Sequence, residues 1–382
     1  MKNVYLDSAA TTQMRDEVIN RMTSVMKEVY GNPSSTHSFG RSAKSLIEQA
    51  RKTVAGYLNV RASEIIFTSG GTEADNLALN SAVRDLGVKR IITSKIEHHA
   101  VLYTVEQLQD CFDVEVVYVD LDSCGNVKET HLEELLKTSD KKTLVSLMHV
   151  NNEIGNKLDI KKVGDLCKEN GAIFHSDCVQ SVGHYDLDFS EIPVDFTAVS
   201  AHKFHGPKGV GFAFIRKNSG LKPLIFGGEQ ERGHRAGTEG VHNIVGLEEA
   251  LKLSLDNLAE EKAYISDLKA YFIEKLKSEI PGVKFNGDCS DLEKSTYTLV
   301  NVCLPVPEDK ALMLLFQLDL KGIACSKGSA CQSGSDKGSH VLSAFLEEED
   351  LKKPSVRFSF SRFNTKEELD YVVKTLKEFI ES

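Results

Sequence analysis

The sequence lacks the features that mark membrane, secreted and nucleic-acid-binding proteins. No stretch approaches the roughly 18–20 apolar residues needed to span a bilayer, and the start, MKNVYLDSAATTQ, has no apolar core of a signal peptide. No dense Lys/Arg block occurs and the net charge is -10, whereas phosphate binding requires a basic face. We therefore expect a cytoplasmic protein that binds neither a membrane nor nucleic acid directly.

The eight cysteines are scattered and none forms a CxxC pair, so the sequence indicates neither a metal site nor a disulfide framework. Most of them should be buried or incidental thiols in a reducing compartment. Cys331 differs, because it lies in KGSACQSGSDKGS, residues 327–339, a run with no apolar period that predicts a solvated loop. A redox pair of Cys331 with the nearby Cys325 is an alternative interpretation.

The chain is long enough for two domains, or for one large domain with a satellite, since it has 382 residues of which 41% are hydrophobic. From residue 65 onward, short β-rich runs such as EIIFTS and RIITS alternate with helical patterns such as EADNLALNSAVRDL and HHAVLYTVEQLQ. This alternation predicts an α/β fold with a mostly parallel sheet between two layers of helices. Sheets of this kind carry their ligand sites at the carboxyl ends of the strands.

The pattern changes after Gly240. Residues 241–280 have helical spacing up to Pro281-Gly282, and a smaller α+β region follows, with strands expected in STYTLVNVCL and SVRFSFSRF and a closing helix from Lys366 to Ile380. We expect a large domain of residues 16–250 and a small domain of residues 1–15 and 251–382 that share one cleft and place Cys331 in the small domain.

Three polar groups follow predicted strands. Lys203 lies in SAHKFHGPKG directly after DFTAV, and Asp177 ends the strand AIFHSD. Gly70-Gly71-Thr72 join a strand to a helix, whose first backbone N–H groups can bind a phosphate. Each motif has a plainer interpretation: a surface lysine in a Gly-Pro turn, a helix-capping aspartate, and an ordinary N-cap turn.

Together, these groups meet the demands of pyridoxal 5'-phosphate. That cofactor needs an amine for an imine bond, an anion on its pyridinium nitrogen and an anchor for its phosphate. The anion keeps the ring protonated, so that the ring can withdraw electrons from the α-carbon of a substrate. The flat ring also needs a lid, and EHHAVL offers His98 or His99 for stacking; either residue could instead be a capping or surface histidine.

At this point the chain is identified as resembling the NifS/IscS-type cysteine desulfurases of the class V aminotransferase family. The matching blocks occur in the family's order from residue 5 to about residue 360: YLDSAATT, GNPSSTH, FTSGGTEADNLAL, EHHAVL, MHVNNEIG, HSDCVQSVG, SAHKFHGPKGVG, GGEQERGHRAGTE, GSAC and SVRFS. The combination of SAHK…GPKG with GSAC is the most specific part. The resemblance implies the fold of type I pyridoxal-phosphate enzymes, with a seven-stranded, mostly parallel sheet and a smaller α+β domain.

The resemblance also implies roles for individual residues. Lys203 would bind the cofactor covalently, Asp177 would hold its pyridine nitrogen, and His98 would stack on its ring. The other cofactor-binding residues that it implies are Gln180 and Asn152 beside the 3-oxygen, and Gly71, Thr72, Ser200, His202 and, from a second subunit, Thr238 at the phosphate. Thr238 thereby implies a homodimer.

Substrate binding is implied for three further positions. Arg357 would hold the carboxylate of the substrate, which suits a planar bidentate donor, although an ion pair on the surface of a strand is an alternative. Asn152 and Asn32 would line the same cleft. Departures from the family's common residues occur at Gly71, Cys178, Ala236 and Phe360-Ser361, and none of them removes a group with a chemical role.

The implied reaction explains the exposed cysteine. Lys203 would move the α-proton of L-cysteine, and Cys331 would take the sulfur as a persulfide and leave L-alanine. The persulfide would then pass to a sulfur-acceptor protein, such as an iron–sulfur scaffold, or serve in thiolation. Selenocysteine cleavage on the same site stays open, as does another transaminase-like reaction of class V, although transamination needs no cysteine. A more distant alternative is a catalytically idle regulator of sulfur assembly.

Overall fold

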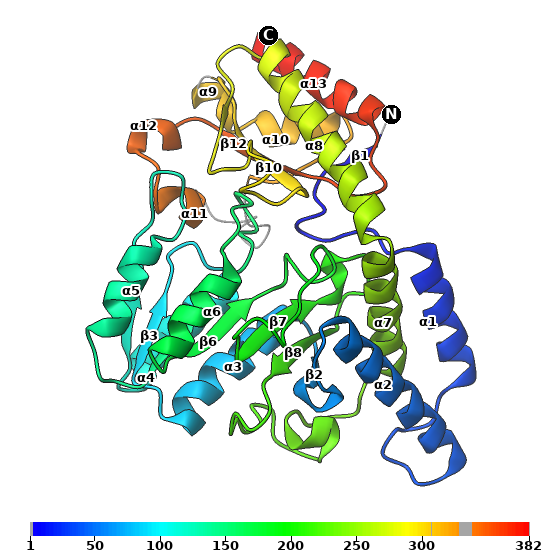
Figure 1. The fold of residues 1–382 in the computed structure, drawn as a ribbon. Coiled ribbons are helices and arrows are strands. Elements are labelled where there is room, and N and C mark those ends of the chain that lie inside the picture. Colours follow the sequence, from blue (N-terminus) through cyan, green and yellow to red (C-terminus); the bar gives the residue numbers. More distant parts are fainter. Residues whose placement is uncertain (1–2, 307, 328–337, 382) are drawn as a thin grey trace.

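The computed structural model describes residues 3–306, 308–327 and 338–381 (Figure 1). Its main element is a seven-stranded sheet with the strand order β2-β8-β7-β6-β5-β3-β4. The strands are β2 (Ile65–Thr68), β3 (Arg90–Thr93), β4 (Glu115–Tyr118), β5 (Thr143–Ser146), β6 (Ile173–Asp177), β7 (Phe196–Ser200) and β8 (Gly211–Ile215). Only β8 runs against its neighbours, β2 and β7. The predicted α/β fold with a mostly parallel sheet is confirmed.

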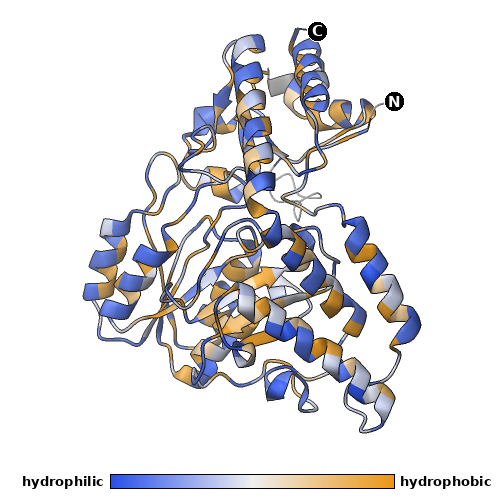
Figure 2. Cartoon of the chain, turned by 45° about the vertical axis from the view of Figure 1, so that its right-hand side comes forward, coloured by the Kyte–Doolittle hydropathy of each residue, from blue (hydrophilic) through white to orange (hydrophobic). Residues whose placement is uncertain are grey.

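The strands are continuous apolar runs because the sheet is covered on both faces. Every residue of β2, β3, β5, β7 and β8 is buried, whereas the edge strand β4 is partly exposed. A strand that is buried on both sides gains nothing from alternation of polar and apolar residues. Figure 2 shows the result, with mostly orange strands inside and two-toned helices around them.

The helices form two layers around this sheet. One layer comprises α3 (Gly71–Leu86) and α4 (His99–Cys111), which pack on residues such as Ile91, Phe196 and Ala213. The opposite layer comprises α2 (Ser38–Tyr57), α5 (Glu129–Lys137), α6 (Ile160–Glu169) and α7 (Val241–Asp256), with α1 (Asp16–Glu28) outside α7. Loops at the carboxyl ends of β2, β6 and β7 therefore emerge between the two layers.

The helical pattern predicted for residues 241–280 is divided in the structure. α7 ends at Asp256 and α8 (Leu258–Glu279) begins after Asn257, whose backbone lies outside the helical region (φ -105°, ψ 11°). The side chain of Asn257 donates from Nδ2 to the carbonyl oxygen of Leu253 at 2.7 Å, and this bond satisfies an end group of α7. α7 packs on the large sheet layer, while α8 packs on α13 (Lys366–Glu381) in the smaller lobe.

The smaller lobe contains both chain ends (Figure 1). Its three-stranded antiparallel sheet has the order β12 (Ser355–Ser359), β10 (Leu299–Cys303), β9 (Lys284–Phe285), and β1 (Val4–Tyr5) pairs in parallel with β11 (Ile323–Ala324). The short helices there are α9 (Glu308–Ala311), α10 (Leu314–Leu320), α11 (His340–Ser343) and α12 (Glu348–Leu351). A separate apolar core joins Val4 and Leu6 to residues from Ile265 to Leu376, which anchors the N-terminal segment at the junction of the lobes.

Across the part of the chain that the structure describes, no helix is both long and apolar enough to span a bilayer. Within the same residues, His, Cys, Asp and Glu side chains form no group of three or more with the geometry to hold a metal ion.

Candidate active site

A cavity of about 210 Å³ lies at the carboxyl ends of β6 and β7. Its walls are formed by Ala9, Ala10, Gly71, Thr72, Asp75, His98, Met148, Asn152, Asp177, Val179, Gln180, Ser200, His202, Lys203 and Arg357. Ten of these residues are ones that the sequence predicted for the site. The fold therefore brings together in one small space residues that are separated by up to 348 positions (Ala9 to Arg357) along the chain.

Lys203 is held at the wall of this cavity by the N-terminal segment. Its Nζ donates to the carbonyl oxygens of Ala9 at 2.7 Å and Ala10 at 2.9 Å. Gln180 donates from Nε2 to the same Ala9 oxygen at 2.9 Å. Sequence reasoning missed both alanines, because they act through their backbones; the block YLDSAATT was the only signal that the segment belongs to the site.

Asp177 ends β6 with its side chain buried in the floor of the cavity. Burial raises the pKa of this carboxyl to about 6, although a hydrogen bond from the backbone N–H of Val179 (2.8 Å) and the charge of Lys203 act in the opposite direction. A carboxylate in this position is stabilised most by a nearby cation. The site therefore favours a ligand that presents a cationic group here.

The start of α3 provides a place for an anion. The N-cap residue is Gly70, which has no side chain to accept from the first N–H groups of this 16-residue helix, so these donors remain for a ligand. The hydroxyls of Thr72 and Ser200 line the same cavity. At Gly71, an added Cβ would come within 2.5 Å of Cγ2 of Val179, which accounts for glycine where alanine is frequent in the family.

His98, and not His99, faces the cavity. His98 is the N-cap of α4 and accepts at Nδ1 from the backbone N–H of Ala100 at 3.1 Å. Burial, Lys203 and His340 lower its pKa to about 4, so the ring is neutral and carries its proton on Nε2. The His99 ring instead stacks on Tyr103, with 4.8 Å between centroids. The two adjacent histidines alone did not decide between them; the family resemblance pointed to His98, which is the one that lines the cavity.

Arg357 reaches the cavity from β12 of the smaller lobe. Its side chain is 1% exposed. Nη1 donates to the carbonyl oxygen of Asn152 at 2.7 Å, and Nη2 donates to Oδ1 of Asp7 at 2.9 Å. The ion pair considered as an alternative for this arginine does exist, but it is buried at the cavity and therefore orients the guanidinium there. Asp7 was not among the predicted site residues.

Two of the predicted residues, Asn32 and Thr238, do not line this cavity. Asn32 is exposed, and its Oδ1 accepts from the backbone N–H of Ser34 at 2.9 Å in a surface turn; the expectation that it lines the same cleft is not met within this chain. Thr238 is also exposed and does not line the cavity; it was expected to act on a second subunit. Cys331 lies outside the described residues.

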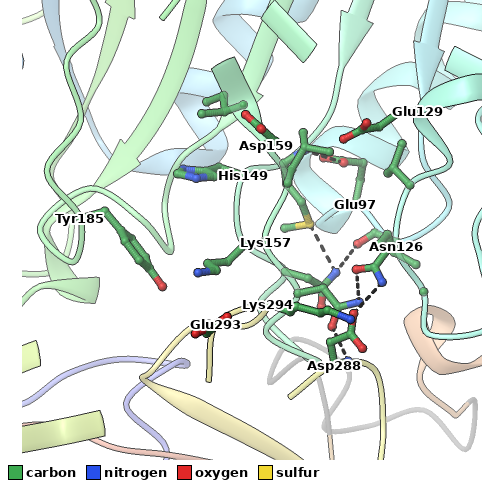
Figure 3. Close-up of a pocket in the computed structure, with 18 of the residues that line it drawn as sticks. Glu97, Asn126, Glu129, His149, Lys157, Asp159, Tyr185, Asp288, Glu293 and Lys294 are labelled. Atoms are coloured by element: carbon green, nitrogen blue, oxygen red, sulfur yellow. Dashed lines mark hydrogen bonds between the residues drawn. The ribbon is translucent and has the colours of Figure 1, made fainter. Parts of the chain in front are cut away.

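A larger cavity of about 600 Å³ lies next to the first, and Met148 lines both. Figure 3 shows its polar lining, with Glu97 and His149 on the side of the large sheet and Glu293 and Lys294 on the side of the smaller lobe. None of the residues that line this second cavity was predicted from the sequence to belong to a site. Its main relevance to the active site is that Glu97, which lines it, has its pKa raised by burial and by the charge of Asp177.

The model of one protein family, aminotransferase class-V, matches residues 4–372. The chain belongs to this family. Among curated relatives of this chain, the putative cysteine desulfurase IscS 1 of Bacillus subtilis is 43% identical over 385 residues, covering 100% of the chain and 99% of that protein. The cysteine desulfurase IscS of Dictyoglomus turgidum is 41% identical and the match covers 100% of the chain and 95% of that protein.

Solved structures of the family support the same fold. A NifS-like protein superposes with a TM-score of 0.90 at 35% identity, and both chains are covered completely. The NifS-like protein of Rickettsia africae gives a TM-score of 0.89 at 32% identity, also with complete coverage. SspA, solved in complex with cysteine, gives 0.81 at 31% identity, with 95% of this chain and 100% of that chain covered.

Proposed function

We propose that this protein is a cysteine desulfurase that removes sulfur from L-cysteine, yields L-alanine and carries the sulfur as a persulfide on Cys331, with pyridoxal 5'-phosphate as its cofactor. The observation that carries this proposal is the convergence of Lys203, Asp177 and Arg357 on one cavity that also contains the open start of α3. The full-length relatives named cysteine desulfurase support the substrate.

The cavity fits the proposed cofactor in the chemistry of its donors. Lys203 would bond to the aldehyde carbon, Asp177 would hold the pyridine nitrogen, and the N–H groups at the start of α3 would hold the phosphate. Thr72, Ser200 and His202 would add donors at the phosphate, His98 would cover the ring, and Gln180 and Asn152 would lie toward the 3-oxygen. When bound, this cofactor supplies an electron sink that weakens bonds at the α- and β-carbons of an amino acid.

The residues of the chain then bind the substrate and move its proton. The Arg357 guanidinium would bind the carboxylate of L-cysteine through two parallel hydrogen bonds. Lys203 would take the α-proton on Nζ. His98 would add no charge to the site, because burial lowers the pKa of its imidazole and keeps it neutral. The guanidinium of Arg357 would thus bind the substrate carboxylate, and the amine of Lys203 would accept the α-proton.

The sulfur transfer would use the thiolate of Cys331, since the thiolate is the nucleophilic form. A bond forms between the Cys331 sulfur and the substrate sulfur while the substrate C–S bond breaks. The electron pair of that C–S bond stays with the carbon, which takes up a proton and becomes the methyl group of alanine. Selenocysteine would react by the same route, whereas transamination leaves Cys331 without a role.

The proposal also includes a homodimer and a protein that accepts the sulfur. Two chains would form a homodimer in which Thr238 of each completes the phosphate site of the other. The persulfide would pass to a sulfur-acceptor protein in the cytoplasm, such as an iron–sulfur scaffold; the name IscS of several relatives supports an acceptor of this kind. The large domain would comprise residues 16–250, and residues 1–15 and 251–382 would form the small domain.

The test is to purify the protein, record its visible absorbance and follow alanine released from L-cysteine, with L-selenocysteine in parallel. We expect a visible band from bound cofactor and equal amounts of alanine and transferred sulfur. A colourless protein that releases no alanine after cofactor is added would support the idle regulator instead. Release of alanine only from L-selenocysteine would support the lyase.

A further inference from the structure

Two other carboxyl groups are buried beside Asp177. Asp75 and Glu97 are each 1% exposed. Burial raises the pKa of both carboxyls well above the ordinary range, and the charge of Asp177 adds to this effect. One deep site cannot hold three like charges, so Asp75 and Glu97 are neutral acids and Asp177 is the remaining anion. A neutral carboxyl is a hydrogen-bond donor. A donor next to Asp177 can occupy the Asp177 carboxylate and so compete with a ligand for it.

The partner of Asp75 is fixed by the alternation of β6. His175 and Asp177 are two residues apart, so their side chains point to the same face of the sheet, the face that carries α3 and hence Asp75. Nε2 of His175 lies 3.3 Å from Oδ1 of Asp75. Nδ1 of His175 lies 2.8 Å from Oγ of Ser146 on the neighbouring strand β5. All of these side chains are buried.

The proton of this group resides on Asp75. Burial lowers the pKa of His175 to about 3, so the imidazole does not take the proton and no ion pair forms. Oδ1 of Asp75 and Nε2 of His175 face each other at 3.3 Å, and neither atom has a hydrogen bond to any other described group, so the carboxyl proton of Asp75 lies toward Nε2. Because a neutral imidazole carries one N–H, Nδ1–H donates to Ser146. Glu97 is arranged differently: its Oε1 accepts from the backbone N–H of Met148 at 2.7 Å, toward the cavity of Figure 3.

We propose that His175 is a positioning residue for Asp177: by accepting the carboxyl proton of Asp75, it keeps that donor turned away from the Asp177 carboxylate. Asp75 and Asp177 line the same cavity, so without His175 the O–H of Asp75 would turn to Asp177. A carboxylate that already accepts a hydrogen bond is a weaker partner for a protonated ring nitrogen. The inference rests on the proposed function, since the ring nitrogen belongs to the proposed cofactor.

Other titratable groups surround this one and contribute to the pH dependence of the site. Those on the elements packed around Asp75 and Asp177 are Glu97, His98, His149, Cys178, His202, Lys203 and Arg357. These groups contribute to the pH dependence of the wild type and of every variant alike. A comparison between variants therefore isolates the contribution of His175.

The experiment compares holoenzymes of the wild type, His175→Leu, His175→Gln and Asp75→Leu/His175→Leu. The visible absorbance of bound pyridoxal 5'-phosphate is titrated against pH, and its Kd is measured on stripped protein. In His175→Leu we expect the Kd of pyridoxal 5'-phosphate to rise about tenfold, because the ring nitrogen is held less firmly, and the pH midpoint of the visible band, which reports the imine nitrogen, to move by about one unit in response. Gln offers an amide oxygen near the position of Nε2, so His175→Gln should stay near the wild type. The double variant should recover, because the competing donor is gone.

The proposal is overturned if His175→Leu titrates like the wild type, or if its shift persists in the double variant. Circular dichroism checks folding. If His175→Leu does not fold, Ser146→Ala takes its place: it frees the imidazole to move its proton to Nε2, and a shift in the same direction but smaller is expected, while no shift overturns the proposal. A wild type without a visible band contradicts the proposed function, and this outcome differs from variants that all titrate alike.

Discussion

Nη2 of Arg357 donates to Oδ1 of Asp7 at 2.9 Å, and this pair joins β12 of the smaller lobe to the N-terminal segment at the wall of the active-site cavity. Arg357 is 1% exposed, so its charge would be costly to bury without a partner. Asp7 therefore orients the guanidinium at the cavity wall. The same segment continues to Ala9 and Ala10, which hold Lys203.

Substitution Arg357→Lys should weaken binding of L-cysteine. Lysine keeps the charge but loses the planar fork, and loss of a charge-assisted hydrogen bond costs roughly 1.5–3 kcal/mol, which corresponds to about a 10- to 150-fold rise in KM. Asp7→Asn, which retains the size and an acceptor, should have a smaller effect. Steady-state kinetics of alanine release measure both, and an unchanged KM in Arg357→Lys would contradict the assignment.

Lys203→Ala should abolish covalent attachment of the cofactor and slow alanine release by at least about 10²–10⁴-fold, the usual contribution of a positioned proton-transfer group. Lys208→Ala is the matched control, since Lys208 is exposed on the same loop. Absorbance and turnover are compared for the two proteins. Wild-type turnover in Lys203→Ala would contradict the assignment of Lys203 as the residue that binds the cofactor covalently.

Cys331→Ala should bind cofactor and L-cysteine but form no persulfide, whereas Cys325→Ala should stay largely active. The reason is that burial raises the pKa of the Cys325 thiol to about 12, so almost no thiolate forms there near neutral pH. Mass spectrometry after incubation with L-cysteine locates the added sulfur. Sulfur on the peptide of Cys325 instead would show that the nucleophile is misassigned.

Acid should destabilise the fold through buried histidines such as His205, which is 4% exposed and donates from Nδ1 to the carbonyl oxygen of Gln13 at 2.7 Å. Burial lowers its pKa from 6.5 to about 3. The unfolded chain thus binds a proton below pH 6.5 that the folded chain does not bind, and stability falls as pH falls from 6.5 toward 3.

For His205 this loss reaches about 2 kcal/mol near pH 5. His205→Asn should flatten the pH dependence of Tm by a corresponding amount, because asparagine tolerates the positive φ of this position (67°) and does not titrate. Calorimetry between pH 7 and 5 measures both proteins. Equal slopes would show that His205 does not carry this part of the acid sensitivity.

The chain should be a dimer at working concentrations, and Thr238→Ala should retain pyridoxal 5'-phosphate less tightly than the wild type, because each Thr238 is proposed to donate to the phosphate in the other subunit. Cofactor retention should then depend on protein concentration. Light scattering and equilibrium dialysis test this together. A fully active monomer would exclude the shared site.

The sequence by itself determined the elements and the main chemical groups. The alternation of apolar runs and helical periods is local, and so is the position of Lys203 and Asp177 at strand ends; parallel strands bring such ends to one edge of a sheet. These features could be read without coordinates because each depends on neighbours along the chain.

Only the tertiary structure decided the contacts between distant segments. The pairing of Asp7 with Arg357 spans 350 residues, and the carbonyls of Ala9 and Ala10 carry no side-chain signal at all. The rotation of α4 against the sheet is the physical reason why His98, the residue to which the family resemblance pointed, lines the cavity while His99 does not. The approach of Asp75 to His175 requires α3 to lie over β6. Such contacts depend on packing between elements, and the sequence pattern of a single element does not contain that information.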